Sequence, residues 1–291
     1  MQNIKYILIL SVLLLSACCI NDDNSDCPNT YLNFSYVSEE NGEVGDYIHS
    51  AKLLIYNSNN ELVLQRDIDQ TQINQGLGIQ LPPGDYYAVA WGNAGEHSVL
   101  SDIQHIEDAR LSTNGYPNIK TIETNDPLYL GTHSWTISER NNYNHAIYET
   151  IDYRSAHLSV DVRIFGVEGG LAQVRVNNLM PQYNFQMGDT KPNNITYSPL
   201  VKYIEEEDMQ RAYLHVLRYK GKTPMTIDIL LNQESTYNVD VRKLVEQKYP
   251  DFTLERKTDF TIIIEVVFDG VEMHVQVLDW EEDNITNTPI S

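Results

Sequence analysis

Residues 260–277 restrict the possible folds most strongly, because apolar and polar side chains alternate along them on both sides of a turn. Phe260 and Ile262 begin a run in which every second side chain is apolar, and the same period returns after Asp269-Gly270. A period of two places such side chains on one face of a strand. An Asp-Gly pair between two alternating runs is a strong hairpin signal. The segment therefore predicts an antiparallel hairpin with one buried face.

Other segments repeat this pattern. Residues 157–165 alternate strictly, with Leu158 and Val160 on one side and Asp161 on the other. Two further pairs of apolar runs flank residues typical of turns, namely 51–56 with 61–65 around Asn57-Ser58-Asn59-Asn60, and 78–81 with 86–91 around Pro82-Pro83-Gly84-Asp85. Asn, Pro, Gly and Asp favour turns because of their backbone preferences and local hydrogen bonds. Each pair is therefore expected to form a hairpin.

Helical periodicity is scarce. Residues 240–248 place apolar side chains at helical spacing, and Pro250 would end that helix. The stretch 114–144 is rich in Asn, Tyr and Thr, and clean alternation resumes near Asp152. We therefore expect an all-β chain of two antiparallel β-sandwich domains in tandem, residues 30–151 and 152–291, with one or two short helices.

The N-terminus has the pattern of a bacterial lipoprotein signal. Lys5 precedes an apolar run at residues 6–15, which is about half the length of a membrane-spanning helix. Leu15-Ser16-Ala17-Cys18 then reads as a lipobox. We expect residues 1–17 to be removed as a signal peptide and the Cys18 thiol to carry a diacylglyceryl group. Two or three acyl chains on this residue would anchor the protein durably in a membrane.

The mature chain would begin with a polar, acidic segment, residues 18–29, which we interpret as a flexible tether. All three cysteines lie by position 27, so Cys19 and Cys27 either pair with each other or stay unpaired. The whole chain has a formal charge of −21. Such an acidic protein lacks the basic face that nucleic acid binding requires, and its membrane attachment must come from lipid.

No motif in the sequence indicates an enzyme. The eight histidines lack the spacing of a zinc hydrolase helix, and no nucleophile elbow, Walker loop or dinucleotide fingerprint is present. His157, His215 and His274 lie in strand-like runs, where we expect solvent-facing or rim positions. We therefore expect no catalytic residue, metal ligand or cofactor site. The 19 tyrosines and three tryptophans leave one alternative function, a surface glycan-binding lipoprotein of a polysaccharide-uptake system.

Several segments together resemble the FimB/Mfa-type fimbrial anchor lipoproteins of Bacteroidales. The most specific is residues 81–93, LPPGDYYAVAWGN. Cys18 with its acidic tether, Cys27-Pro28 with the following Leu32/Phe34 strand, and the late run VQVLDW at residues 275–280 are also similar to the family pattern. Acidic residues after the lipidated cysteine resemble the surface-export signal of lipoproteins in these bacteria.

The resemblance implies two transthyretin-like sandwich domains, an outer-membrane location at the cell surface, and a role in cell adhesion at the base of a fimbrium. It implies fimbrial shaft subunits as partners, joined by strand exchange, in which backbone hydrogen bonds supply affinity. In the resembling shaft subunits an arginine-directed protease removes an N-terminal segment. Here no Arg or Lys lies between Cys18 and Lys52, so we expect the chain to keep its lipid and its first strand.

Overall fold

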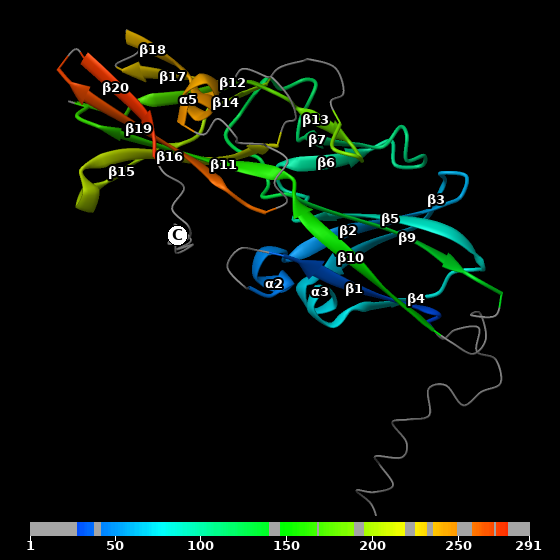
Figure 1. Cartoon of the computed structure of the whole chain (residues 1–291). Helices are drawn as coiled ribbons and strands as arrows, with labels where there is room; N and C mark the ends of the chain where they lie inside the picture. Colours follow the sequence, from blue (N-terminus) through cyan, green and yellow to red (C-terminus); the bar gives the residue numbers. More distant parts are fainter. Residues whose placement is uncertain are drawn as a thin grey trace, which may run out of the picture.

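The computed structural model describes residues 28–37, 42–139, 146–167, 169–188, 195–218, 225–231, 235–248, 258–270 and 272–278. In this part of the chain, strands form four sheets and helices are few and short. The strands group into two bodies that follow one another along an elongated molecule (Figure 1). The all-β fold expected from the alternating runs is confirmed.

The first body is a seven-stranded sheet of order β3-β2-β5-β9-β10-β1-β4. Its strands are β1 (Thr30–Tyr36), β2 (Ser50–Asn57), β3 (Leu62–Asp69), β4 (Leu77–Ile79), β5 (Gly84–Gly92), β9 (Tyr129–Ile137) and β10 (Ile147–Ser155). The β9–β10 pairing is confined to the Tyr129–Thr132 end of β9, so the sheet divides into two layers around a core. Helices α2 (Val44–Tyr47) and α3 (Gln70–Gln75) lie against β1.

The second body is built mainly from two five-stranded sheets, of orders β15-β16-β11-β19-β20 and β18-β17-β12-β14-β8. The first contains β11 (His157–Phe165), β15 (Val201–Ile204), β16 (Met209–Leu217), β19 (Thr261–Asp269) and β20 (Glu272–Val277), with the 3-10 helix η3 (Glu205–Glu207) between β15 and β16. The second contains β8 (Thr121–Ile122), β12 (Gln173–Leu179), β14 (Ile195–Tyr197), β17 (Thr226–Leu231) and β18 (Ser235–Asp240), followed by α5 (Val241–Lys248).

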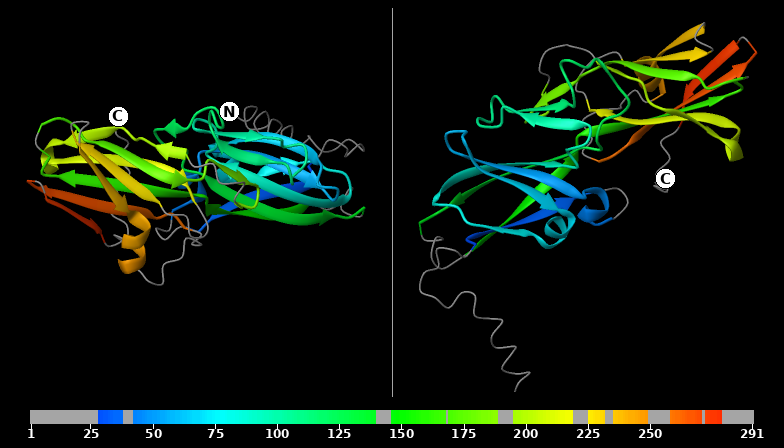
Figure 2. Two further views of the ribbon diagram at one scale, coloured as in Figure 1. Left: turned by 90° about the horizontal axis from the view of Figure 1, so that it is seen from above. Right: turned by 180° about the vertical axis from the view of Figure 1, so that it is seen from behind.

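The segment between β5 and β9 connects the two bodies. It forms β6 (Ser98–Ser101) and β7 (Arg110–Thr113), and β7 pairs with β13 (Gln182–Asn184). The same segment supplies β8, which pairs in parallel with β14. Figures 1 and 2 show β6 and β7 lying beside strands from the later half of the chain. Residues that precede position 152 thus complete sheets of the second body, and the predicted division into 30–151 and 152–291 stays a prediction.

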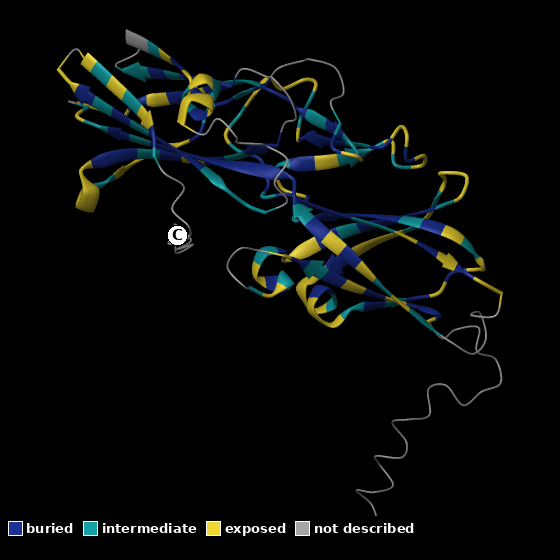
Figure 3. Cartoon of the chain, viewed as in Figure 1, coloured by how far each residue is buried: buried dark blue, intermediate teal, exposed yellow. Residues whose placement is uncertain are grey.

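One of the two hydrophobic cores extends from the first body into the second. Trp91 of β5 is fully buried, and its ring lies 6.3 Å from that of Tyr183 and 6.0 Å from that of Phe185. This core also contains the inward side chains of β11 and β19, whereas a separate core fills the first body between its layers. We call the region where β10 ends at Ser155 and β11 begins at His157 the junction of the two bodies. Figure 3 shows buried residues continuing along β11 from this junction. The two bodies therefore share apolar packing and are not merely tethered.

Two of the three expected hairpins are confirmed. β2 pairs with β3, and β19 pairs with β20. Asp269 and Glu272 are the last pair before the turn, and Gly270, which follows Asp269, has a left-handed φ of 62°. The expected helix at 240–248 is confirmed as α5.

The third expected hairpin is wrong, because β4 pairs with β1 and not with β5. A strand has only two edges. β5 uses one against β2 from Ala51 to Asn57 and the other against β9 from Tyr129 to Ile137. The three residues of β4 offer much less pairing than either of these partners. The Pro-Pro-Gly turn therefore reverses the chain without joining adjacent strands.

Replacing Trp91 with Ala should destabilise the whole molecule by about 3–5 kcal/mol, because a buried indole shared by both bodies leaves a cavity. Urea unfolding followed by circular dichroism should show one transition, shifted as a whole. Leu171→Ala is the control, since Leu171 is 55% exposed and its truncation should change stability by less than about 0.5 kcal/mol. Two separate transitions, of which Trp91→Ala shifts only one, would contradict a shared core.

Candidate functional site

The predicted lipid-attachment residue, Cys18, lies outside the described residues, as do Cys19 and Cys27. Its acylation stays a prediction. The described part of the chain begins at Pro28, two residues before β1. No helix in that part is long and apolar enough to cross a membrane. The site that the structure describes therefore begins with β1, the strand that follows the predicted tether.

Strand β1 closes the core of the first body. Leu32, Phe34 and Tyr36 point into this core and are at most 8% exposed, whereas Tyr31 and Asn33 face outward. The strand pairs in parallel with β10 along its whole length and antiparallel with β4 over its first three residues. If β1 left the first body, the core that its three apolar side chains cover and the edge of β10 that it pairs with would be exposed to water. β1 is thus an integral part of the first body.

Asn29 holds the beginning of β1. Its side-chain amide donates to the carbonyl of Leu81 at 2.6 Å, and its Oδ1 accepts from the Leu81 N–H at 3.2 Å. Its backbone N–H donates to the Ile79 carbonyl, and its carbonyl accepts from the Ile147 N–H. Asn29 is only 4% exposed, so these hydrogen bonds satisfy polar groups that would otherwise be costly to bury. They join the start of β1 to two segments of the first body, residues 79–81 and the start of β10.

Tyr36 holds the other end of β1 and contacts the second body. Its hydroxyl oxygen accepts from the backbone N–H of Asp259 at 3.0 Å, and its ring packs edge-on against those of Tyr47 and Tyr129, each 5.0 Å away. The Tyr129 hydroxyl donates to the Asp259 carboxylate at 2.6 Å. Burial and the nearby Asp259 raise the pKa of both tyrosines far above its ordinary value, so both hydroxyls keep their protons.

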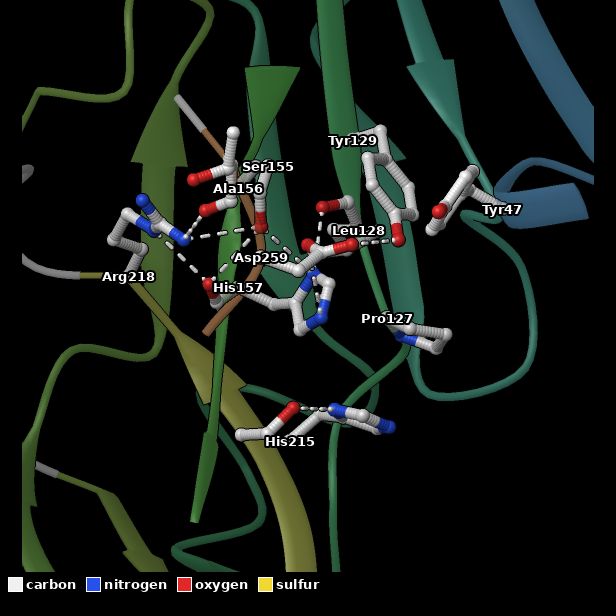
Figure 4. A network of polar contacts seen from close by, with 12 residues as sticks. Tyr47, Pro127, Leu128, Tyr129, Ser155, Ala156, His157, His215, Arg218 and Asp259 are labelled. Carbon is white, nitrogen blue, oxygen red and sulfur yellow. Dashed lines mark hydrogen bonds and ion pairs between the residues drawn. The ribbon is translucent and has the colours of Figure 1, made fainter. Parts of the chain in front are cut away.

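A buried polar cluster continues from Asp259 into the second body (Figure 4). The His157 Nε2 lies 3.6 Å from the Asp259 carboxylate, and the His157 Nδ1–H donates to the Leu128 carbonyl at 3.0 Å. The guanidinium of Arg218, 2% exposed, donates to the carbonyls of His157 and Thr258 and to the Ser155 hydroxyl. These bonds join the end of β10, the start of β11 and the segment before β19.

The histidine positions expected from the sequence are only partly right. His274 is exposed, as expected, but His157 is 4% exposed and lies inside the junction. His215 is half-buried, with its ring 4.9 Å from that of His157 and its Nδ1 3.1 Å from the Ser159 hydroxyl. Burial lowers the pKa of His157, and burial together with His157 lowers the pKa of His215 to about 3. Alternation correctly predicted that Leu158 and Val160 are buried, but the opposite face of β11, with His157 and Asp161, is buried as well.

The cluster is arranged for structure more than for chemistry. Ser155 and Ser159 each contact a histidine, which is also the pattern of a nucleophile and its base. Both serines are at most 5% exposed, so a substrate has no access to their hydroxyls. Within the described residues, no group of three or more His, Cys, Asp or Glu side chains could hold a metal ion. The polar groups instead form hydrogen bonds with one another.

Comparison with known proteins identifies the family. A family model for fimbrillin-A associated anchor proteins Mfa1 and Mfa2 matches residues 24–286. The match covers both bodies, including β1 and the junction. The chain belongs to this family. Membership makes it a fimbria-associated protein, and it agrees with the resemblance read from residues 81–93 and the N-terminal segment.

Solved structures show the same fold at low sequence identity. The fimbrial anchor protein Mfa2 from Porphyromonas gingivalis superposes with a TM-score of 0.64 at 15% identity, over 87% of this chain and 96% of that one. A candidate adhesin from Bacteroides ovatus gives 0.68 at 16% identity, over 90% and 96%. A candidate polysaccharide-binding protein from Bacteroides thetaiotaomicron gives 0.68 at 11%, over 89% and 100%. No curated protein sequence matches the chain.

Asn29→Ala should loosen β1. The substitution removes two side-chain hydrogen bonds to Leu81 and should cost about 1–3 kcal/mol. Amide hydrogen exchange should become faster along β1 before it changes in β19. Asn33→Ala is the matched control, because Asn33 is exposed on the same strand and its replacement should leave exchange in β1 almost unchanged. Equal effects of the two variants would refute the role of Asn29.

The free energy of unfolding should fall as the pH drops below about 6.5. In the unfolded chain the pKa of His215 is near 6.5, whereas burial in the folded protein lowers it to about 3, so protonation favours the unfolded chain. At pH 5 this linkage is worth on the order of 2 kcal/mol. Replacing His215 with Gln, which keeps a polar group beside Ser159, should remove that part of the loss. Thermal unfolding at pH 7 and pH 5 measures both proteins. An identical drop in Tm for both would show that His215 is not responsible.

Proposed function

We propose that this protein is the anchor and assembly subunit of a fimbrium, attached to the outer membrane by lipid on Cys18 and joined to shaft subunits by strand exchange. The observation that carries this proposal is the state of β1. The strand is fully seated and held at both ends, by Asn29 and by Tyr36. Family membership supports the fimbrial part of the proposal.

The sequence ahead of β1 supports a terminal position in the fibre. No Arg or Lys lies between Cys18 and Lys52, so cleavage after a basic residue cannot separate the tether from β1. A subunit that keeps both would remain attached to the membrane, with its first sandwich already closed. Such a subunit cannot accept a neighbour's strand in place of β1, and so joins the fibre through another edge.

Strand β20 supplies an edge of the required kind. It is the outermost strand of its sheet and pairs only with β19 among the described residues. Met273, Val275 and Val277 point toward the core, and the side chains between them are exposed. The Val277 carbonyl at the end of β20 already accepts from the Lys248 ammonium at 2.6 Å. An added strand would therefore pair along the rest of this outer edge, in the manner of β-augmentation. We therefore propose the β20 edge as the joining surface and a structural role without catalysis.

Purification from detergent-solubilised outer membranes tests the proposal. The protein should retain a pilin-like partner in high salt, because strand exchange buries its hydrogen bonds and salt screens them poorly. Cys18→Ala should move the chain out of the outer-membrane fraction, whereas Cys19→Ala, the neighbouring control, should not. Recovery of the chain alone, or with a glycan transporter, would contradict the fimbrial assignment. Membrane retention of Cys18→Ala would contradict the lipid anchor.

A further inference from the structure

A cleft of about 370 Å³ opens on the outer face of the first body. Its floor comes from the beginning of β5 and the end of β9, where Asp85 pairs with Thr136 and Tyr87 with Ser134. These four side chains share the solvent-facing side of the sheet, while the residues between them on each strand are buried. The turn from β2 to β3, with Asn57 and Asn60, forms one wall.

The groups around the cleft are held in place before any ligand arrives. The Thr136 hydroxyl donates to the Asp85 carboxylate at 2.6 Å. The Asn57 carboxamide oxygen accepts from two backbone N–H groups of its own turn, at 2.9 and 3.0 Å. Asn60 has a left-handed φ of 64°, and its amide donates to Glu107 at 2.6 Å. A preorganised polar wall lowers the entropy cost of binding.

The chemistry of the cleft selects the ligand. Among the described residues that line it, none carries a positive charge, so an anion would meet only the repulsive carboxylate of Asp85. Hydroxyl, amide and carboxylate groups surround the half-buried ring of Tyr87. Sugar hydroxyls can both donate and accept hydrogen bonds, and the C–H face of a sugar ring can lie against an aromatic ring. These complementary features fit a neutral carbohydrate.

We propose that this cleft binds neutral sugar units of a glycan, with Tyr87 as the stacking surface. Asp85, Ser134 and Thr136 supply hydrogen bonds to the sugar hydroxyls. The volume lies near the lower end for small-molecule sites, so the cleft holds about one or two sugar rings of a longer chain.

The site lies in the first body, away from β20 at the far end of the molecule (Figure 1). Glycan binding is therefore compatible with joining a fibre, and neither property depends on the other. A second pair of tyrosines in the first body lies outside the cleft. Tyr31 and Tyr148 lie on each other, with ring centres 5.2 Å apart, on the β1–β10 layer outside the cleft.

Affinity electrophoresis of the full mature chain tests the proposal. Native gels would contain a mannan, a galactan or a glucan as neutral probes, and polygalacturonate as the acidic probe. At least one neutral gel should retard the wild-type protein, and polygalacturonate should not. Tyr87→Ala should weaken the retardation at least tenfold, whereas Tyr148→Ala, which removes an exposed tyrosine elsewhere, should leave it unchanged.

A second variant covers the case in which Tyr87→Ala fails to fold, since Tyr87 also packs beside the shared core. Ser134 is exposed, so Ser134→Trp should fold normally while filling the cleft. An unchanged Tm with retardation weakened at least tenfold would support the site. Absence of retardation in every neutral gel would overturn the proposal. So would retardation of folded Ser134→Trp equal to that of the wild type.

Discussion

The packing of Trp91 against Tyr183 and Phe185 is the interaction on which the relation of the two bodies depends. Separate cores would leave the bodies free to swing about the short link between β10 and β11. Here one core runs from β5 into the second body. The segment that carries β7 and β8 pairs with β13 and β14 of the later half of the chain. The polar cluster around Asp259 adds hydrogen bonds next to it. The two bodies are therefore held together by both apolar packing and hydrogen bonds, which agrees with the proposed role of an anchor subunit.

Alternation of side chains was sufficient to predict the all-β fold, the β2–β3 and β19–β20 hairpins, and the burial of Leu158 and Val160 on β11, because each depends on residues that are close in sequence. It failed for β4, since the sequence around Pro82-Pro83 does not reveal that both edges of β5 are taken by longer strands. It also failed for His157. The groups that contact this ring, the Leu128 carbonyl, Asp259 and His215, come from distant segments, and no local pattern brings them together.

The candidate surfaces differ in how far the sequence could predict them. The tether and the lipid on Cys18 are predicted from the order of residue types alone, and Cys18 lies outside the described residues. The seating of β1 depends on Asn29 meeting Leu81 and on Tyr36 meeting Asp259, pairs separated by 52 and 223 positions. The cleft beside Tyr87 arises from the register of β5 on β9 and from the β2–β3 turn. The first body thus follows the predicted tether and carries the cleft, and the second body carries the β20 edge.

Retention of β1 is the central claim, because a closed first sandwich distinguishes a terminal subunit from one that accepts a neighbour's strand. Mass spectrometry of this chain from isolated, intact fimbriae tests it most directly. The proposed anchor should give an N-terminal peptide that begins at an acylated Cys18 and continues without a break through Tyr36. A mature chain whose first residue lies after Tyr36 would contradict it.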